Sequence, residues 1–172
     1  MGWFSAERVE AEPDLAGLVA TYSGLLYRVA LSILRNSPEA EDVVQDTFVR
    51  VLQQKRKLSG VAEMRPWLVR IAWNLALDRR RRVRPQQMDE AFAAGLVAGE
   101  MAADEALAEA RRMSKVLRAI ERLPGREREA LLLSAMDELS TAEIGKVLGR
   151  SESSVRSLLF RARTRLRERL GE

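Results

Sequence analysis

The chain has 172 residues, with 29 Lys and Arg against 25 Asp and Glu, a formal net charge of +4, and neither cysteine nor histidine. This length predicts one domain or two small ones. The missing residue types exclude a disulfide framework, a thiolate nucleophile, cysteine zinc sites and serine–histidine triads. Only carboxylate, Lys or Tyr chemistry remains open to an enzyme.

Targeting signals are also missing from the sequence. No apolar run approaches the roughly 18 residues needed to span a bilayer. The first twelve residues, MGWFSAERVEAE, lack the basic lead and apolar stretch of a signal peptide. We therefore expect a soluble intracellular protein.

Helices are predicted along most of the chain. Ala, Leu, Arg and Glu dominate, and no sustained alternation of β-branched residues is present. We expect an all-α fold of two small helical domains, 10–83 and 103–172. Their helices are expected over 14–35, 38–56, 66–82, 103–122, 125–137, 141–148 and 152–170.

The charge is unevenly divided between these parts. The net charge is +3 over residues 1–82, −5 over 83–110 and +6 over 111–172. The middle segment contains proline and glycine and few large apolar residues, which predicts a flexible acidic linker over 84–102. It is interpreted either as a solvated tether or as a segment that repels stray DNA from the basic surfaces beside it.

The second expected helix carries two stripes at helical spacing. The first predicts a core face and consists of Ala40, Val43, Val44, Thr47, Phe48, Val51 and Leu52. Ser37 is expected to cap this helix. The second stripe points elsewhere and consists of Asp42, Gln45, Asp46 and Val49. A solvated polar face explains this stripe most simply. A Mg²⁺ site at Asp42 and Asp46, in a carboxylate-based nuclease, is a weaker alternative.

The third expected helix combines tryptophan with a run of arginines and follows a basic, turn-rich segment. Arginine neutralises phosphate, and aromatic faces stack on exposed bases at about 1–3 kcal/mol each. This composition predicts contacts with single-stranded or distorted DNA from Trp67, Asn74 and the arginine run that begins at Arg79. The alternative is that Trp67 and Trp73 are core residues and that the arginines only solubilise a helix end.

The last two expected helices predict a helix-turn-helix. Ser140 and Glu143 form a capping box, Gly149 suits the end of the short helix, and Ser151 caps the next one. The start of the longer basic helix then faces a major groove. The DNA contacts expected from it are Ser151, Ser153, Ser154, Arg156, Ser157, Phe160, Arg161 and Arg163. An ordinary αα-hairpin with a basic solvent face is the alternative.

In this order, the segments resemble the extracytoplasmic-function (ECF, group 4) sigma factors of the sigma-70 family, over nearly the whole chain. Residues 40–48, AEDVVQDTF, resemble the helix that docks on the β′ clamp helices of core RNA polymerase. Residues 67–74, WLVRIAWN, resemble the helix that faces the −10 promoter element. Residues 123–129, LPGRERE, resemble the start of the second domain, and 143–145 with 155–163 resemble the helix-turn-helix that recognises the −35 element.

The resemblance implies a non-catalytic bacterial transcription initiation factor without metal, cofactor or membrane insertion. Its partners are core RNA polymerase, through the clamp helices and the β flap, promoter DNA, and an anti-sigma factor. It implies that the stripe with Asp42 and Asp46 docks on polymerase, and that the protein is cytoplasmic and joins the nucleoid when bound to polymerase. It also implies that the −10 element is contacted by Arg56, Lys57, Arg65, Trp67, Arg70, Asn74, Arg79, Arg80 and Arg81. The main alternative is a stand-alone helix-turn-helix regulator that does not bind polymerase and needs a dimer seam.

Three residues depart from the family's pattern. Leu158 stands where the family usually has arginine, which removes one expected DNA contact. Trp73 stands where arginine is frequent. Gly145 stands where alanine is frequent, and we expect the close helix crossing at this point to accommodate alanine.

Overall fold

The computed structural model describes residues 14–82, 90–97, 102–136 and 138–171. Every regular element within these ranges is a helix, so the all-α prediction is confirmed. Residues 14–82 are called the first half below and residues 102–171 the second half.

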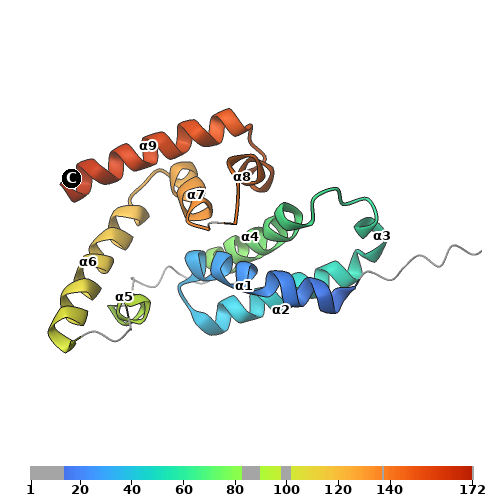
Figure 1. Cartoon of the computed structure of the whole chain (residues 1–172), viewed down its shortest axis with the longest axis horizontal. Helices are drawn as coiled ribbons and strands as arrows, with labels where there is room; N and C mark the ends of the chain where they lie inside the picture. Colours follow the sequence, from blue (N-terminus) through green and yellow to red (C-terminus); the bar gives the residue numbers. More distant parts are fainter. Residues whose placement is uncertain (1–13, 83–89, 98–101, 137, 172) are drawn as a thin grey trace, which may run out of the picture.

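The first half is built from three long helices and one short one. They are α1 (Leu15–Leu34), α2 (Ser37–Gln53), α3 (Lys55–Leu58) and α4 (Met64–Arg82). Helices α1, α2 and α4 pack on one another, and α3 lies at the far end of this group (Figure 1). The turn-rich basic segment of the sequence is therefore held at one end of a three-helix core.

Helix α2 buries most of the stripe predicted for it. Its buried residues are Ala40, Val43, Thr47, Phe48 and Val51. Leu52 is 41% exposed, so its expected place in the core is wrong; it lies in the last turn of α2, beside the short α3. The cap also differs by one residue, because the Asn36 side chain accepts from the Glu39 backbone N–H at 2.9 Å and Ser37 is the first helical residue.

Helix α1 is long and apolar, although the sequence analysis finds no apolar run that approaches the length of a membrane span. It is 20 residues long and meets, by length and composition alone, the requirements of a membrane span. The core helix of a soluble protein meets the same requirements. Helix α1 packs in this way, because it buries Leu25, Leu26 and Val29 against α2 and α4.

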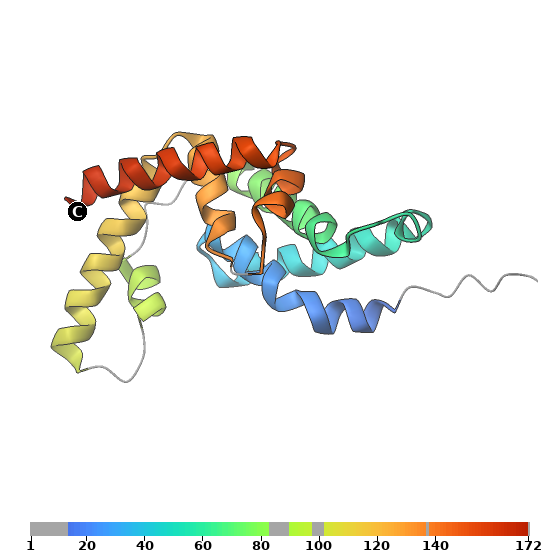
Figure 2. The ribbon, with the colours of Figure 1, turned by 45° about the horizontal axis from the view of Figure 1, so that its top comes forward.

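The remaining helices are α5 (Glu90–Val97), α6 (Ala103–Glu121), α7 (Gly125–Ser134), α8 (Thr141–Leu148) and α9 (Glu152–Leu170). Helix α5 lies within the segment for which the sequence predicts a flexible linker, and it packs along α6, away from α9 (Figure 2). Helices α7, α8 and α9 form the core of the second half. Helix α9 lies along one side of this half and packs against α6, α7 and α8 (Figure 2).

The helix-turn-helix forms with the predicted caps. Ser140 Oγ accepts from the Glu143 backbone N–H at 3.2 Å, and Glu143 Oε2 accepts from the Ser140 N–H at 2.8 Å. Gly149 ends α8 with a φ of 65°, in the left-handed region that glycine favours. Ser151 Oγ accepts from the Ser154 N–H at 3.2 Å and starts α9.

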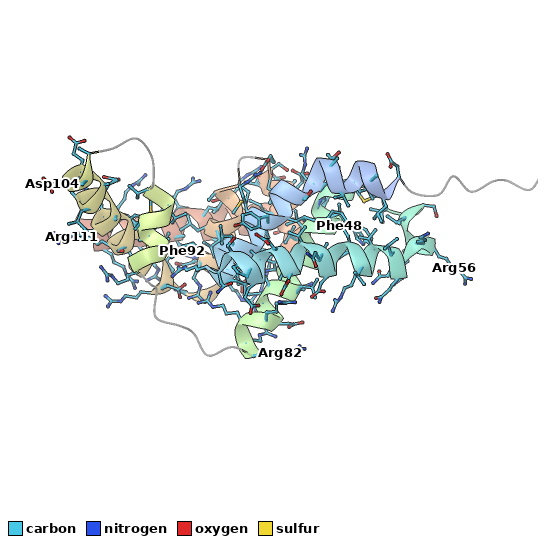
Figure 3. All side chains as sticks on the ribbon, turned by 90° about the horizontal axis from the view of Figure 1, so that it is seen from below. Phe48, Arg56, Arg82, Phe92, Asp104 and Arg111 are labelled. Atoms are coloured by element: carbon cyan, nitrogen blue, oxygen red, sulfur yellow. The ribbon has the colours of Figure 1, made fainter. Side chains whose placement is uncertain are left out.

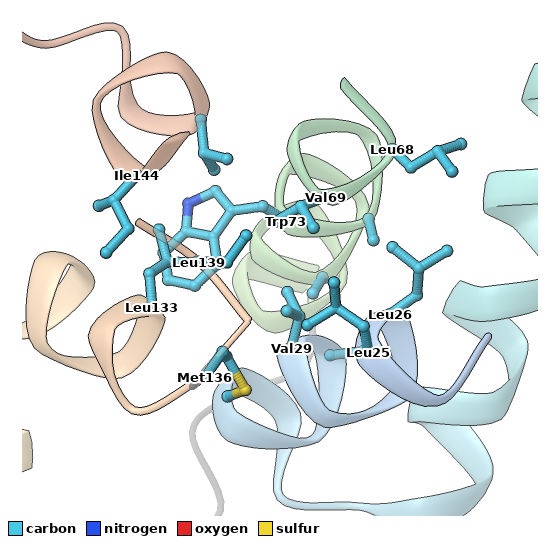
Figure 4. Close-up of a cluster of buried hydrophobic side chains, with 14 of the residues drawn as sticks. Leu25, Leu26, Val29, Leu68, Val69, Trp73, Leu133, Met136, Leu139 and Ile144 are labelled. Carbon is cyan, nitrogen blue, oxygen red and sulfur yellow. The ribbon is translucent and has the colours of Figure 1, made fainter. Parts of the chain in front are cut away.

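The two halves share a buried apolar cluster. Helix α4 packs against α8, and α1 contacts α7. Trp73 of α4 is 2% exposed, and its ring points into the second half toward Leu133, Leu139 and Ile144 (Figure 4). Trp73 is therefore a core residue, but of a core to which both halves contribute.

Candidate nucleic-acid interface

The start of α9 presents a polar face to solvent. Val155, Leu158, Leu159 and Ala162 are buried and hold α9 against the rest of the second half. The opposite side carries seven of the eight predicted DNA contacts as exposed residues: Ser151, Ser153, Arg156, Ser157, Phe160, Arg161 and Arg163. Ser154 is half-buried beneath them. We call these eight residues the α9 face.

Leu158, which replaces the family's usual arginine, belongs to the core side of α9. It is 6% exposed. Phe160 is 72% exposed and is the most exposed large apolar side chain in the described part of the chain. The α9 face thus has one free aromatic ring among serines and arginines.

Glu152 connects the two helices of the helix-turn-helix. Its Oε1 accepts from the Thr141 hydroxyl of α8 at 2.7 Å, and the same atom pairs with Arg156 one turn further along α9. The hydrogen bond from Thr141, together with the charge of Arg156, lowers the pKa of the Glu152 carboxyl. Arg156 is therefore oriented by an ion pair before any DNA is bound.

Glu127 lies where α7 meets the middle of α9, and the sequence analysis did not single it out. It is buried, and its carboxylate is paired with both Arg161 and Arg165. The acid stands in the alternating run RERE, in which spacing alone does not show which member is buried.

On the first half, six of the nine predicted DNA contacts are exposed: Arg56, Lys57, Arg65, Arg70, Asn74 and Arg81. Figure 3 shows Arg56 at the α3 end and Arg82 at the opposite end of the half. Trp67 is half-buried and packs against the core, while the exposed Arg81 lies 3.6 Å from Asp78 on its own helix. The predicted contacts thus extend from α3 along the length of α4.

Arg65 and Arg80 are engaged by the second half. Arg65 donates to the Glu138 carbonyl oxygen at 3.0 Å and lies 3.5 Å from the Glu143 carboxylate. Arg80 donates to Glu121 Oε2 at 2.9 Å. Two residues expected to contact DNA are therefore paired with acids of the opposite half.

Further ion pairs join the two halves. Arg28 pairs with Glu138 at 2.5 Å, and Arg35 pairs with Glu121 at 2.8 Å. Lys146 pairs with Glu63. These pairs, those of Arg65 and Arg80, and the apolar cluster at Trp73 are called the interdomain contact below.

Arg79 joins residues that the sequence analysis assigns to different partners. It donates to Asp46 at 2.8 Å, Glu39 at 3.0 Å and Asp42 at 3.3 Å. The hydrogen bond that Arg79 donates to Asp46 is the main cause of the raised pKa of Arg79. Arg79 therefore orients the acidic stripe of α2, beside which Gln45 and Val49 are exposed.

The nuclease alternative has no support at this cluster. Asp42 and Asp46 contact a guanidinium, which occupies the position between them that a cation needs. Within the described ranges, no group of three or more His, Cys, Asp or Glu is placed to hold a metal ion.

Comparison with known proteins gives the family. The model for sigma-70 region 2 matches residues 18–86, and the model for sigma-70 region 4 matches residues 113–166. The ECF RNA polymerase sigma factor SigW of Bacillus subtilis is 30% identical over 164 residues, which are 90% of this chain and 88% of SigW. The chain belongs to the sigma-70 family as an ECF sigma factor.

Other relatives agree with this assignment. The ECF sigma factor SigE of Mycolicibacterium smegmatis is 34% identical over 167 residues, which cover 94% of this chain and 63% of SigE. The structure of CnrH in complex with the cytosolic domain of CnrY has a TM-score of 0.68 and 29% identity, and covers 91% of this chain and 87% of CnrH. The sigma factor thus binds core RNA polymerase and directs promoter-specific transcription initiation. Sigma factors are not enzymes, and a stand-alone regulator is not favoured, because the region 2 match spans the first half.

Proposed function

We propose that this sigma factor divides promoter recognition between two domains, 10–83 and 103–172. The second domain recognises duplex DNA at the −35 element, and the first docks on polymerase and captures an unpaired base of the −10 element. The observation that carries this proposal is the α9 face, which leaves the first two turns of a capped helix-turn-helix helix open to solvent.

The α9 face has the chemistry of a major-groove contact. Ser153, Arg156 and Ser157 lie in the first two turns, which is the part of a recognition helix that reaches base edges. Arginine bonds guanine in the major groove through two parallel donors. Arg163 lies further along α9 and suits phosphate contacts, which position the protein without recognising sequence.

The docking surface of the first domain is the α2 stripe of Asp42, Gln45, Asp46 and Val49. Val49 is 49% exposed, so an apolar side chain lies beside carboxylates that Arg79 holds in place. A polar stripe with one exposed apolar residue fits the β′ clamp helices of core polymerase. The second domain additionally contacts the β flap.

The two domains must separate when they recognise a promoter. The −10 and −35 elements lie about 25 base pairs apart, or roughly 85 Å at 3.4 Å per base pair. Domains that touch through the interdomain contact cannot contact both elements at once. Opening of the interdomain contact releases Arg65 and Arg80 for DNA, and the linker 84–102 then spans the gap.

A further partner is an anti-sigma factor. CnrH was solved with the cytosolic domain of CnrY, and RpoE of Bartonella quintana was solved with the anti-sigma factor NepR. We assign a partner of the same class to this chain. The sigma factor is cytoplasmic and joins the nucleoid when it is bound to polymerase. We expect it to use no catalytic group, cofactor or metal of its own.

Run-off transcription tests the proposal directly. Core RNA polymerase is combined with this chain and with a library of genomic promoter fragments from the source organism. We expect transcripts from promoters with shared −35 and −10 sequences. Gel filtration with and without core polymerase tests the alternative. A dimer that does not bind polymerase and that binds duplex DNA by itself would contradict the proposal.

A further inference from the structure

Glu127 forms an unusual junction behind the α9 face. It lies in the first turn of α7 and is 5% exposed. Its Oε1 lies 3.4 Å from Arg161 Nε and its Oε2 lies 3.0 Å from Arg165 Nε. The two arginine side chains are 51% and 48% exposed. One buried carboxylate therefore holds two cations that stand one turn apart on α9.

Each member of this group depends on the others. A buried carboxylate is costly unless it is paired. Arg161 and Arg165 are separated by four residues on a helix, where like charges repel. Glu127 compensates both effects. Its Oε2 has no aligned hydrogen bond, so the contact with Arg165 is mainly one of charge.

The geometry of the two pairs leaves the arginines able to bind DNA. Each contact to Glu127 is made through Nε. A guanidinium carries five N–H donors in a fixed plane, so the Nη groups stay available once Nε is held. Arg161 lies one turn after Ser157 on the same side of α9. The held guanidiniums therefore lie next to the side chains that are placed to contact bases.

We propose that Glu127 is a positioning residue that raises the sequence specificity of −35 recognition. It fixes Arg161 and Arg165 so that their phosphate contacts form at only one position of α9 on the DNA. At that position Arg156 and Ser157 reach base edges. It also reduces the sequence-independent attraction that two free guanidiniums exert on any duplex. This inference rests on the proposed function of the α9 face.

The test compares Glu127→Gln with Glu168→Gln in the full chain. Both changes remove one negative charge from the second half, but Glu168 is exposed on α9 and makes no ion pair within the described residues. Each variant is combined with core RNA polymerase. Binding is measured on a promoter that the wild-type holoenzyme selects from a randomised −35 library, and on the same promoter with the −35 element scrambled.

For Glu127→Gln we expect the ratio of matched to scrambled affinity to fall about threefold to tenfold. The salt dependence on scrambled DNA should steepen by about one unit of slope, because a released arginine adds a phosphate contact. Glu168→Gln should leave the ratio unchanged. Thermal unfolding of both variants separates any loss of stability from the change in specificity.

The outcomes distinguish the two proposals. If the wild-type holoenzyme does not discriminate between the two promoters, the proposed function of the α9 face is wrong. If the wild type discriminates and Glu127→Gln behaves like Glu168→Gln, Glu127 does not position the arginines. Should Glu127→Gln fail to fold, Glu127→Asp keeps the charge and withdraws the oxygens by one methylene. An unchanged affinity ratio in Glu127→Asp then overturns the inference.

Discussion

The two surfaces expected to contact promoter DNA differ in how their cations are engaged. On α4, Arg65 and Arg80 are paired with acids of the second half, and Arg79 is paired with three acids on α2. On α9, Arg156 pairs with the neighbouring Glu152 and Arg161 pairs with Glu127, both within the second half. Arg163 is exposed and has no ion pair among the described residues. The −35 surface is therefore accessible in this arrangement, while part of the −10 surface is occupied by the second half. This difference suggests that the first contact with DNA is made by α9.

Replacing Trp73 should change this comparison most. Trp73→Ala removes a buried indole from the cluster between the halves, and such truncations cost about 3–5 kcal/mol. We expect most of this cost to appear as separation of the halves, with the helix content of each preserved. Small-angle X-ray scattering should show a larger radius of gyration than for wild type. An unchanged radius together with lower helix content would show that the two halves fold only as one unit.

A charge reversal at Asp46 tests the acidic stripe. Asp46→Lys should weaken binding to core polymerase by about 2 kcal/mol or more, because it places a cation in the docking surface. It also loses the partly exposed pair with Arg79, at a cost to folding of about 1 kcal/mol or less. Gln45→Lys is the control for loss of the Arg79 pair. It also places a cation in the docking surface, because Gln45 is exposed on the same stripe, but it breaks no pair with Arg79. Binding to core polymerase that is unaffected by either change would rule out the α2 stripe as the docking face.

Gly145→Ala tests how tightly the helix-turn-helix behind the α9 face is built. A Cβ at this position would lie 2.6 Å from the Arg150 carbonyl oxygen, and the Arg150 N–H donates to the Gly145 carbonyl at 2.8 Å. The expectation that this site accommodates alanine is therefore wrong, because the neighbour is turn backbone and cannot move aside. We expect a loss of about 1–3 kcal/mol in urea unfolding. Gly125→Ala has open space around its Cβ and should cost much less.

The α9 face is tested by separating base contacts from phosphate contacts. Arg156→Ala should cost about 1–3 kcal/mol on the preferred −35 sequence and much less on scrambled DNA. Arg163→Ala should weaken binding to both about equally and reduce the salt dependence. Fluorescence anisotropy of labelled promoters with the holoenzyme measures both. Equal losses for Arg156→Ala on the two sequences would place the base-contacting part of α9 elsewhere.

The smallest effect is expected from pH. The pKa of Glu152 is lowered in the folded protein, so its contribution to stability is present above the unfolded pKa and is lost as the pH falls through the lowered value. The link from Thr141 to Glu152 should therefore weaken only in acid, below the ordinary glutamate range. Glu152→Gln should remove this part of the pH dependence of thermal unfolding. A pH profile identical to wild type would show that the contact contributes nothing.

Local features of the molecule were predictable from the sequence. The capping box at Ser140, the glycine at the end of α8 and the cap at Ser151 depend on residues within four positions of one another. The core stripe of α2 follows from helical spacing alone, apart from its end at Leu52. The family resemblance likewise rests on short continuous segments, such as residues 40–48 and 67–74.

Contacts between distant segments could not be found in this way. The periodicity of α4 places Trp73 off the face that packs within the first half, and nothing in that spacing indicates that a second helical half covers it. Arg79 resembles the other members of an arginine run until α2 is placed beside it. Burial of Glu127 likewise depends on the way α7 meets α9. The sequence thus indicates which residues carry charge, and the packing decides which of those charges are free.

Trp73 also provides the molecule with an optical signal of its own. An indole in an apolar cluster emits at shorter wavelength than one in water, so separation of the halves should shift the emission of Trp73 to the red. Trp67, which is half-buried within the first half, should change much less under the same conditions. Raising the salt concentration screens the ion pairs of the interdomain contact without dissolving the apolar cluster. The chain has a third tryptophan, Trp3, which lies outside the described residues and is replaced by Phe for this measurement. The fluorescence of the Trp3→Phe protein, followed against salt and temperature, therefore measures how much of the interdomain contact is held by charge and how much by the apolar cluster.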